Sequence, residues 1–137
     1  MSEYLVELRD SIMIAHSLPD PFFGPAQAMH GATFTVDATF LANRLTTNNV
    51  VIDIGRAMDT LSAILKPLKY QNLDALPQFA GMLTTTEFLA RHIFDGLAQA
   101  ARTGALGDGS DNLTEIHVLL HESHFARAGY RGKIERD

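Results

Sequence analysis

The chain has 137 residues, 46% of them apolar, which suits a single domain over residues 1–137 with a hydrophobic core of its own. It contains no cysteine, which excludes disulfides, a thiolate nucleophile and cysteine-ligated metal sites. Its net charge of −5 argues against nucleic acid as a partner, because phosphate binding favours a basic surface. The start lacks the basic and apolar stretches of a secretory signal, and no window approaches the roughly 18 apolar residues of a membrane span. We therefore expect a cytoplasmic protein that makes no membrane contact.

The first third of the chain predicts two strands. Residues 4–16 alternate imperfectly between apolar and polar side chains, which predicts a strand with a bulge near Asp10. A proline-rich loop follows over residues 17–27. Residues 32–42 alternate regularly, from Phe34 on the apolar side to Asp37 on the polar side, and predict a half-buried antiparallel strand.

Next come a short apolar run and a first helix. Residues 50–52 follow a polar turn and predict a short strand. Residues 55–66 have apolar side chains at helical spacing. Asp53 is a candidate N-cap for this helix, and Pro67 lies where it must stop.

A second helix and two further extended segments complete the chain. Residues 84–103 repeat apolar side chains every three to four positions. Thr84 and Glu87 fit a capping box at the start of this helix, and Gly104 suits the left-handed position after its end. Residues 114–122 are strand-like, and a last extended piece is expected near Tyr130.

The order strand, strand, helix, helix, strand, strand (ββααββ) predicts an α+β fold with one four-stranded antiparallel sheet and two helices on one face. Such a sheet has two open edges, which must be blunted or paired with another chain.

Three groups of residues are candidates for chemistry. His16 ends the first strand and His30 begins the second, so their rings would approach if these strands pair. Two histidines are a weak zinc site, because zinc normally takes three or four protein ligands. Glu122 ends an apolar strand face, where a carboxylate needs a partner, and a planar heterocycle with two N–H donors would satisfy it. Lys69 and Tyr70 follow the first helix, where an ordinary polar turn also explains them.

Six motifs, in this order and spacing, resemble the 6-pyruvoyl-tetrahydropterin synthase family, which includes the 6-carboxytetrahydropterin synthases of the queuosine pathway. They are Ala15-His16-Ser17-Leu18-Pro19, Met29-His30-Gly31, Val51-Ile52-Asp53-Ile54, Leu68 to Pro77, Thr85-Thr86-Glu87-Phe88-Leu89-Ala90, and His121-Glu122-Ser123 with Ala128 and Tyr130 beyond it. The resemblance implies the tunnelling fold, in which sheets from three chains join into one barrel and two rings stack into a hexamer. It also implies a pterin pocket between subunits.

The family pattern supplies a zinc ion with three histidines, and its first two positions are His16 and His30 here. The third is Ala32, whose methyl group cannot bind a metal. The position of the family's cysteine base holds Ala26, and Lys69 and Tyr70 stand where the family has a proton-relaying Asp–His pair. We therefore expect no resident zinc and no family lyase reaction, because these positions all serve one reaction.

The pterin end of the pocket keeps more of the family pattern, although Thr84 replaces a proline of that pattern. The resemblance makes Glu122 the anchor of a pterin-like or purine-like ring, with Thr85, Thr86 and Glu87 as further ligand-binding residues. The first hypothesis is thus a ring-binding homo-oligomer without the lyase chemistry.

Two alternatives stay open. One is a metal-free pterin side-chain enzyme that uses Lys69 and Tyr70. The other is residual lyase activity, with His124 recruited as a third metal ligand beside His16 and His30.

Overall fold

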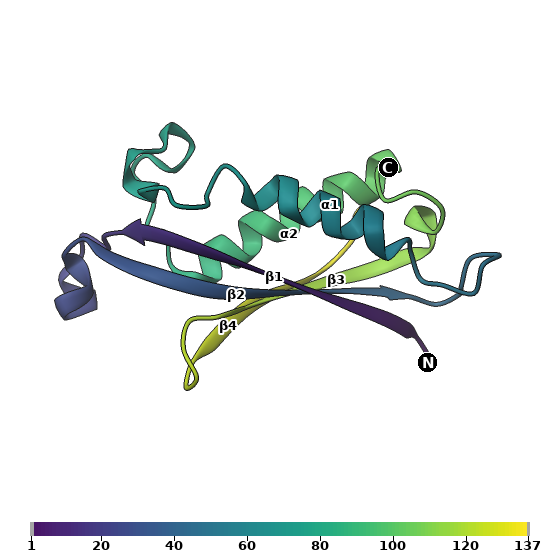
Figure 1. The fold of residues 1–137 in the computed structure, drawn as a ribbon. Helices are drawn as coiled ribbons and strands as arrows, with labels where there is room; N and C mark the ends of the chain where they lie inside the picture. The colour runs from purple at the N-terminus through teal and green to yellow at the C-terminus, as the bar shows by residue number, and fades with distance from the viewer. Residues whose placement is uncertain (1, 137) are drawn as a thin grey trace.

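The computed structural model describes residues 2–136 and shows a four-stranded antiparallel sheet with two helices across one face (Figure 1). The strands lie side by side in chain order, and both helices come between the second and third strands. The main elements are β1 (Tyr4–His16), β2 (His30–Ala42), α1 (Ile54–Leu65), α2 (Thr86–Thr103), β3 (Leu113–His121) and β4 (Arg127–Lys133). The short 3-10 helices in the connections are η1 (Pro21–Gln27), η2 (Leu73–Ala75), η3 (Pro77–Phe79) and η4 (Ser110–Asn112). The predicted element order and α+β class are confirmed.

The long hairpin of β1 and β2 is regular along its whole length. The two strands pair without a shift from Tyr4 opposite Ala42 to His16 opposite His30. The bulge predicted near Asp10 is therefore wrong. The alternation of apolar and polar side chains is imperfect there, but the hydrogen-bonded pairing of the two strands is unbroken. The irregularity of the sheet lies instead between Leu41 and Ala42, where β2 changes register against β3.

The two faces of the sheet differ because side chains alternate along each strand. Phe34, Val36, Ala38 and Phe40 all point to the helices and are at most 1% exposed, as their alternation predicts. Each helix has a row of buried side chains. These include Leu61 and Leu65 of α1 and Leu89, Ile93 and Leu97 of α2. Each such buried side chain contributes about 1.5–3 kcal/mol, so this interface is what holds the helices on the sheet.

The helix ends fit the predicted signals, with one correction. The Asp53 carboxylate accepts a hydrogen bond from the Arg56 amide at the start of α1, and Gly104 ends α2 with a φ of 79°. The predicted capping box at Thr84 is wrong, because the N-cap of α2 is Thr85, whose hydroxyl accepts from the Phe88 amide. The shift by one residue frees the Thr84 side chain for a different contact.

The short strand predicted over residues 50–52 is also wrong. This stretch forms a bend, and the Thr46 amide donates to the Val50 carbonyl at 2.9 Å to close a turn. Val51 and Ile52 are buried at 6% and 1% exposure without joining the sheet. Their apolar side chains pack in the hydrophobic core rather than in a paired strand.

One edge of the sheet is partly covered by the chain itself. The segment after α1 runs along the end of β1, where the Tyr70 amide donates to the Met13 carbonyl and the Ala15 amide donates to the Gln71 carbonyl. The rest of the β1 edge and all of the β4 edge pair with no other strand among residues 2–136. Neither α1 nor α2 has the combination of length and hydropathy that crossing a membrane requires.

Candidate functional site

A cavity of about 500 Å³ lies at the end of the sheet where β1 stops and β2 starts. We call it the end cavity; it is lined by His16, Leu18, Phe22, Phe23, Ala26, His30, Thr85, Thr86, Glu87 and Glu122. Its volume lies within the range of small-molecule sites, roughly 300–1,000 Å³. The structure thus brings together the predicted anchor Glu122, the predicted α2 residues and both predicted histidines, from segments far apart in the sequence.

Different elements supply the walls of the end cavity. η1 contributes the apolar wall, with Phe22 86% exposed and Phe23 half-buried. The first turn of α2 contributes Thr86 and Glu87, and its unpaired backbone N–H groups make this end favourable to negative charge. Glu122 is the first residue after β3 and is exposed in the single chain. An aromatic wall opposite polar groups is the arrangement that holds a flat, polar ring.

The two histidines are held in fixed orientations. Because they are register partners, their ring centroids are 4.6 Å apart, with an interplanar angle of 63°. The His16 Nδ1 atom is 3.0 Å from the hydroxyl of Thr84, a buried threonine. The His30 Nδ1 atom donates to the Ala28 carbonyl at 2.8 Å, which leaves Nε2 of this ring as a lone-pair acceptor.

No third ligand stands beside His16 and His30 within residues 2–136. Ala32, at the third ligand position, pairs with Ile14 in the sheet and packs its methyl group against the core. His124 is exposed in the β3–β4 loop and does not line the end cavity. Among residues 2–136 there is no group of three or more His, Asp or Glu side chains placed to hold a metal ion. Two histidines fall short of the three or four ligands that zinc takes in proteins.

Burial lowers the pKa of His16, and the neighbouring His30 lowers it further. The unfolded chain binds this proton with the ordinary pKa of 6.5, so acidification through that value favours the unfolded state. We expect the free energy of unfolding to fall as the pH drops from 7 towards 5, and to fall less in a His16→Asn variant. Urea unfolding at the two pH values measures this, and an NMR titration of His16 at or above 6.5 would contradict it.

Lys69 and Tyr70 do not line the end cavity. The Lys69 ammonium lies 3.5 Å from the Asp10 carboxylate, and Tyr70 is 81% exposed beside the β1 edge. Tyr70 has a φ of 59°, a backbone conformation that costs energy for a non-glycine residue. Any part that these two side chains play at a ring site would have to come through a second chain.

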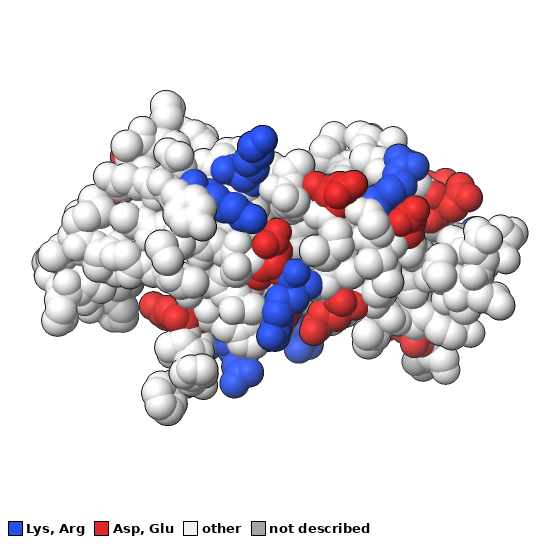
Figure 2. All heavy atoms as spheres, viewed as in Figure 1, with Lys and Arg blue, Asp and Glu red and all other residues white. Residues whose placement is uncertain are grey.

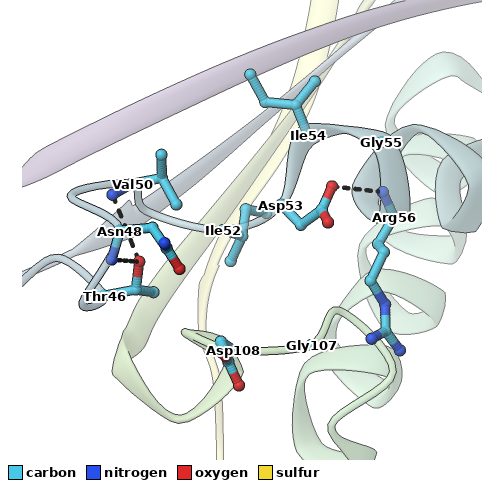
Figure 3. Close-up of a pocket in the computed structure, with 10 residues that line it drawn as sticks. All are labelled: Thr46, Asn48, Val50, Ile52, Asp53, Ile54, Gly55, Arg56, Gly107 and Asp108. Carbon is cyan, nitrogen blue, oxygen red and sulfur yellow. Dashed lines mark hydrogen bonds between the residues drawn. The ribbon is translucent and has the colours of Figure 1, made fainter.

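A second cavity of about 540 Å³ lies at the opposite end of the molecule, between the loop after β2 and the start of α1 (Figure 3). Two of its polar side chains, those of Thr46 and Asp53, hydrogen-bond to nearby backbone amides. The Thr46 hydroxyl accepts from the Asn48 and Val50 amides, and Asp53 caps α1. The Asp108 and Arg56 side chains lie on separate parts of its wall (Figure 3). No residue predicted to bind a ligand lies there.

Sequence patterns do not identify two residues that line the end cavity or the residue that contacts His16 from behind it. Thr84 fits a capping box in the sequence, whereas its contact with His16 spans 68 positions along the chain, which no local pattern reveals. Phe22 and Phe23 lie in the predicted proline-rich loop and line the cavity. The signal available for these two was an aromatic pair inside a proline-rich loop, where exposed aromatic side chains have no structural purpose of their own.

The comparisons with known proteins agree with this architecture. The structure of Caenorhabditis elegans 6-pyruvoyl tetrahydropterin synthase is similar over 96% of this chain and 97% of its own, with a TM-score of 0.78 and 21% identity. The structure of the Plasmodium falciparum synthase is similar over 98% of this chain and 100% of its own, with a TM-score of 0.79 and 15% identity. A Plasmodium vivax synthase described as a catalytic-residue mutant, with glutamate replaced by alanine, is similar over 98% of this chain and 100% of its own. Its TM-score is 0.78 and its sequence identity 15%. These likenesses show the tunnelling fold.

No curated protein sequence matches the chain. The sequence profile of 6-pyruvoyl tetrahydropterin synthase, however, matches residues 5–133, which is nearly the whole chain. The chain therefore belongs to the 6-pyruvoyl tetrahydropterin synthase family.

Proposed function

We propose that this protein binds a pterin-type or related purine-like ring in the end cavity and does not carry out the zinc-dependent lyase reaction of its family. The observation that carries the proposal is the composition of this cavity. It contains Glu122 and the first turn of α2, yet Ala26 stands on its wall where the family pattern has a cysteine.

The ring-binding half of the proposal rests on complementarity. A carboxylate at Glu122 can accept two parallel N–H groups from the amino-pyrimidine edge of a pterin or guanine. Phe22, Phe23 and Leu18 offer an apolar surface to the ring. We further propose that the cavity, open in the single chain, is closed by a neighbouring subunit in a homo-oligomer, in line with the hexamer expected for the family.

The other half rests on missing groups. A methyl group at Ala26 has no acidic proton to lose and cannot act as a base. Ala32 offers no donor atom to a metal, so the two histidines remain an incomplete set. We propose that no zinc ion resides here.

A second candidate function comes from the carboxylates of the cavity. A Plasmodium vivax synthase of similar fold is described with a glutamate as a catalytic residue. Glu87 and Glu122 both line the end cavity here. A metal-free proton transfer by Glu87 on a side chain of the bound ring is the form that activity would take.

One experiment separates these functions. The purified oligomer is titrated calorimetrically with 7,8-dihydroneopterin and guanine, assayed for conversion of dihydroneopterin and its triphosphate, and analysed for metal. Ring binding without turnover and without zinc supports the proposal. Metal-free turnover that Glu87→Gln abolishes establishes the second candidate, and a folded oligomer that binds no ring overturns both.

Restoring the third histidine should restore metal binding. Ala32 lies on the same strand face as His30, two residues away, so Ala32→His would complete a three-histidine set with His16. We expect this variant to bind Zn²⁺ at least about tenfold more tightly than the parent, measured by competition with a chromophoric chelator. Thr33→His, on the opposite face of the same strand, is the control and should change nothing. Near-stoichiometric zinc in the parent protein would contradict this reading.

A further inference from the structure

The face of the sheet that the helices leave uncovered contains a charged cluster around one buried carboxylate. The Asp37 side chain is only 6% exposed, although no helix lies over it. The Arg9 guanidinium holds both of its oxygens, with Nε at 2.6 Å and Nη2 at 2.9 Å. His121 adds a third contact from β3, with Nε2 at 2.7 Å. Three strands therefore meet at one carboxylate.

The cluster fixes two basic side chains toward solvent. Arg9 lowers the pKa of Asp37, so the pair is charged at neutral pH. The two bonds to Asp37 use Nε and one N–H of Nη2, which leaves the N–H groups of Nη1 available. The Nδ1 atom of His121 likewise has no hydrogen-bond partner within residues 2–136. Burying a carboxylate costs free energy, so an ion pair of this kind need not stabilise the fold. What the Asp37 carboxylate does is hold the side chains of Arg9 and His121 in place.

Both of these side chains border a hollow of about 490 Å³, which we call the face hollow. Its polar lining includes Arg9, Thr35, His121, Glu122, His124 and Arg127. Arg127 comes from β4 and forms no ion pair within the described chain, and Glu122 is the one carboxylate that borders the hollow. Figure 2 shows basic and acidic side chains close together over the middle of the molecule, including its helix-free lower side. Two arginines and one carboxylate therefore border the face hollow, and the second carboxylate of the cluster, Asp37, is buried beneath it.

We propose that the face hollow is a second ligand site, which binds the phosphate or carboxylate group of a small anionic molecule. The guanidinium of Arg9, already oriented by Asp37, presents parallel N–H donors that match two oxygens of such a group. Arg127 adds a second positive charge, and Thr35 a hydroxyl donor. The site differs from the end cavity, which lies on the helix side of the sheet, although Glu122 borders both.

Inorganic pyrophosphate is the probe for this site, titrated calorimetrically at low ionic strength into the purified oligomer. We expect Arg127→Gln to weaken binding about tenfold or more, since it removes a charge-assisted contact to the anion. The matched control is Arg131→Gln, an exposed arginine on the same strand and face that does not border this hollow. We expect the control to stay within about twofold, because screened surface charge contributes little. Malonate, titrated in parallel, shows whether carboxylates or phosphates bind better.

Glu122→Gln separates this proposal from the proposed function. Removing the carboxylate that borders the hollow should leave pyrophosphate binding unchanged or tighter, whereas ring binding in the end cavity should weaken about 100-fold. The inference is overturned if the parent protein binds neither anion at millimolar concentration. It is equally overturned if Arg131→Gln weakens binding as much as Arg127→Gln, which would mean a diffuse charge effect.

Discussion

Glu122→Gln is expected to weaken binding of a pterin-type ring about 100-fold. The carboxylate of Glu122 accepts two N–H donors from the ring edge, and each charge-assisted hydrogen bond contributes roughly 1.5–3 kcal/mol. Glutamine keeps the shape but presents one acceptor and one donor, so one ring N–H meets an N–H group instead of an oxygen. Calorimetric titration with 7,8-dihydroneopterin measures the change in affinity.

Glu135→Gln is the matched control for this measurement, because Glu135 is exposed and lies outside the end cavity. The control should bind the ring like the parent, and both variants should keep the parent's melting temperature. Equal affinity in Glu122→Gln and Glu135→Gln would remove Glu122 as the anchor. The predicted effect is large because a site that depends on hydrogen bonding discriminates strongly once a partner is mismatched.

Removing Arg9 should destabilise the fold more than neutralising Asp37. Arg9→Met leaves the Asp37 carboxylate buried with only His121 beside it, whereas Asp37→Asn leaves a guanidinium that is 64% exposed and can be hydrated. We expect Asp37→Asn to lower the free energy of unfolding by about 1–2 kcal/mol and Arg9→Met to lower it by more. Urea unfolding followed by circular dichroism measures both.

The double variant completes this test. Arg9→Met with Asp37→Asn should be more stable than Arg9→Met alone, because the double variant has no buried Asp37 carboxylate without a cationic partner. Strictly additive losses would show that the two side chains act independently. The pH provides a second check, since Arg9 lowers the pKa of Asp37. The stability from this pair should persist above the ordinary carboxyl pKa of 3.8 and disappear as the pH falls through the lower folded value.

Local patterns predicted most of the fold. The alternation of apolar side chains up to Phe40 predicts the buried face of β2, and the three-to-four spacing that includes Leu97 predicts the buried side of α2. Both predictions are confirmed. Element ends were predicted where a single residue decides them, as at Asp53 and Gly104. The strand prediction for residues 50–52 is wrong because a short apolar stretch has the same pattern whether it pairs in a sheet or packs into the core as a bend.

The candidate site was predictable only through the family motifs, and only in part. Those motifs named Glu122 and the α2 residues that the end cavity brings together. They did not name Phe22 or Thr84, because the contact of a side chain across many residues depends on how the elements dock.

The sequence by itself determined which groups are missing: a chain without cysteine has no thiolate in any conformation, and position 32 has alanine where the family pattern has a histidine. Only the tertiary structure decided which polar groups meet. Asp37 reads as one more residue on a solvated strand face, and it is buried because strand register places Arg9 opposite it and His121 one strand away. Side-chain chemistry is a property of each residue alone, whereas burial and hydrogen bonding are properties of the neighbours that folding supplies.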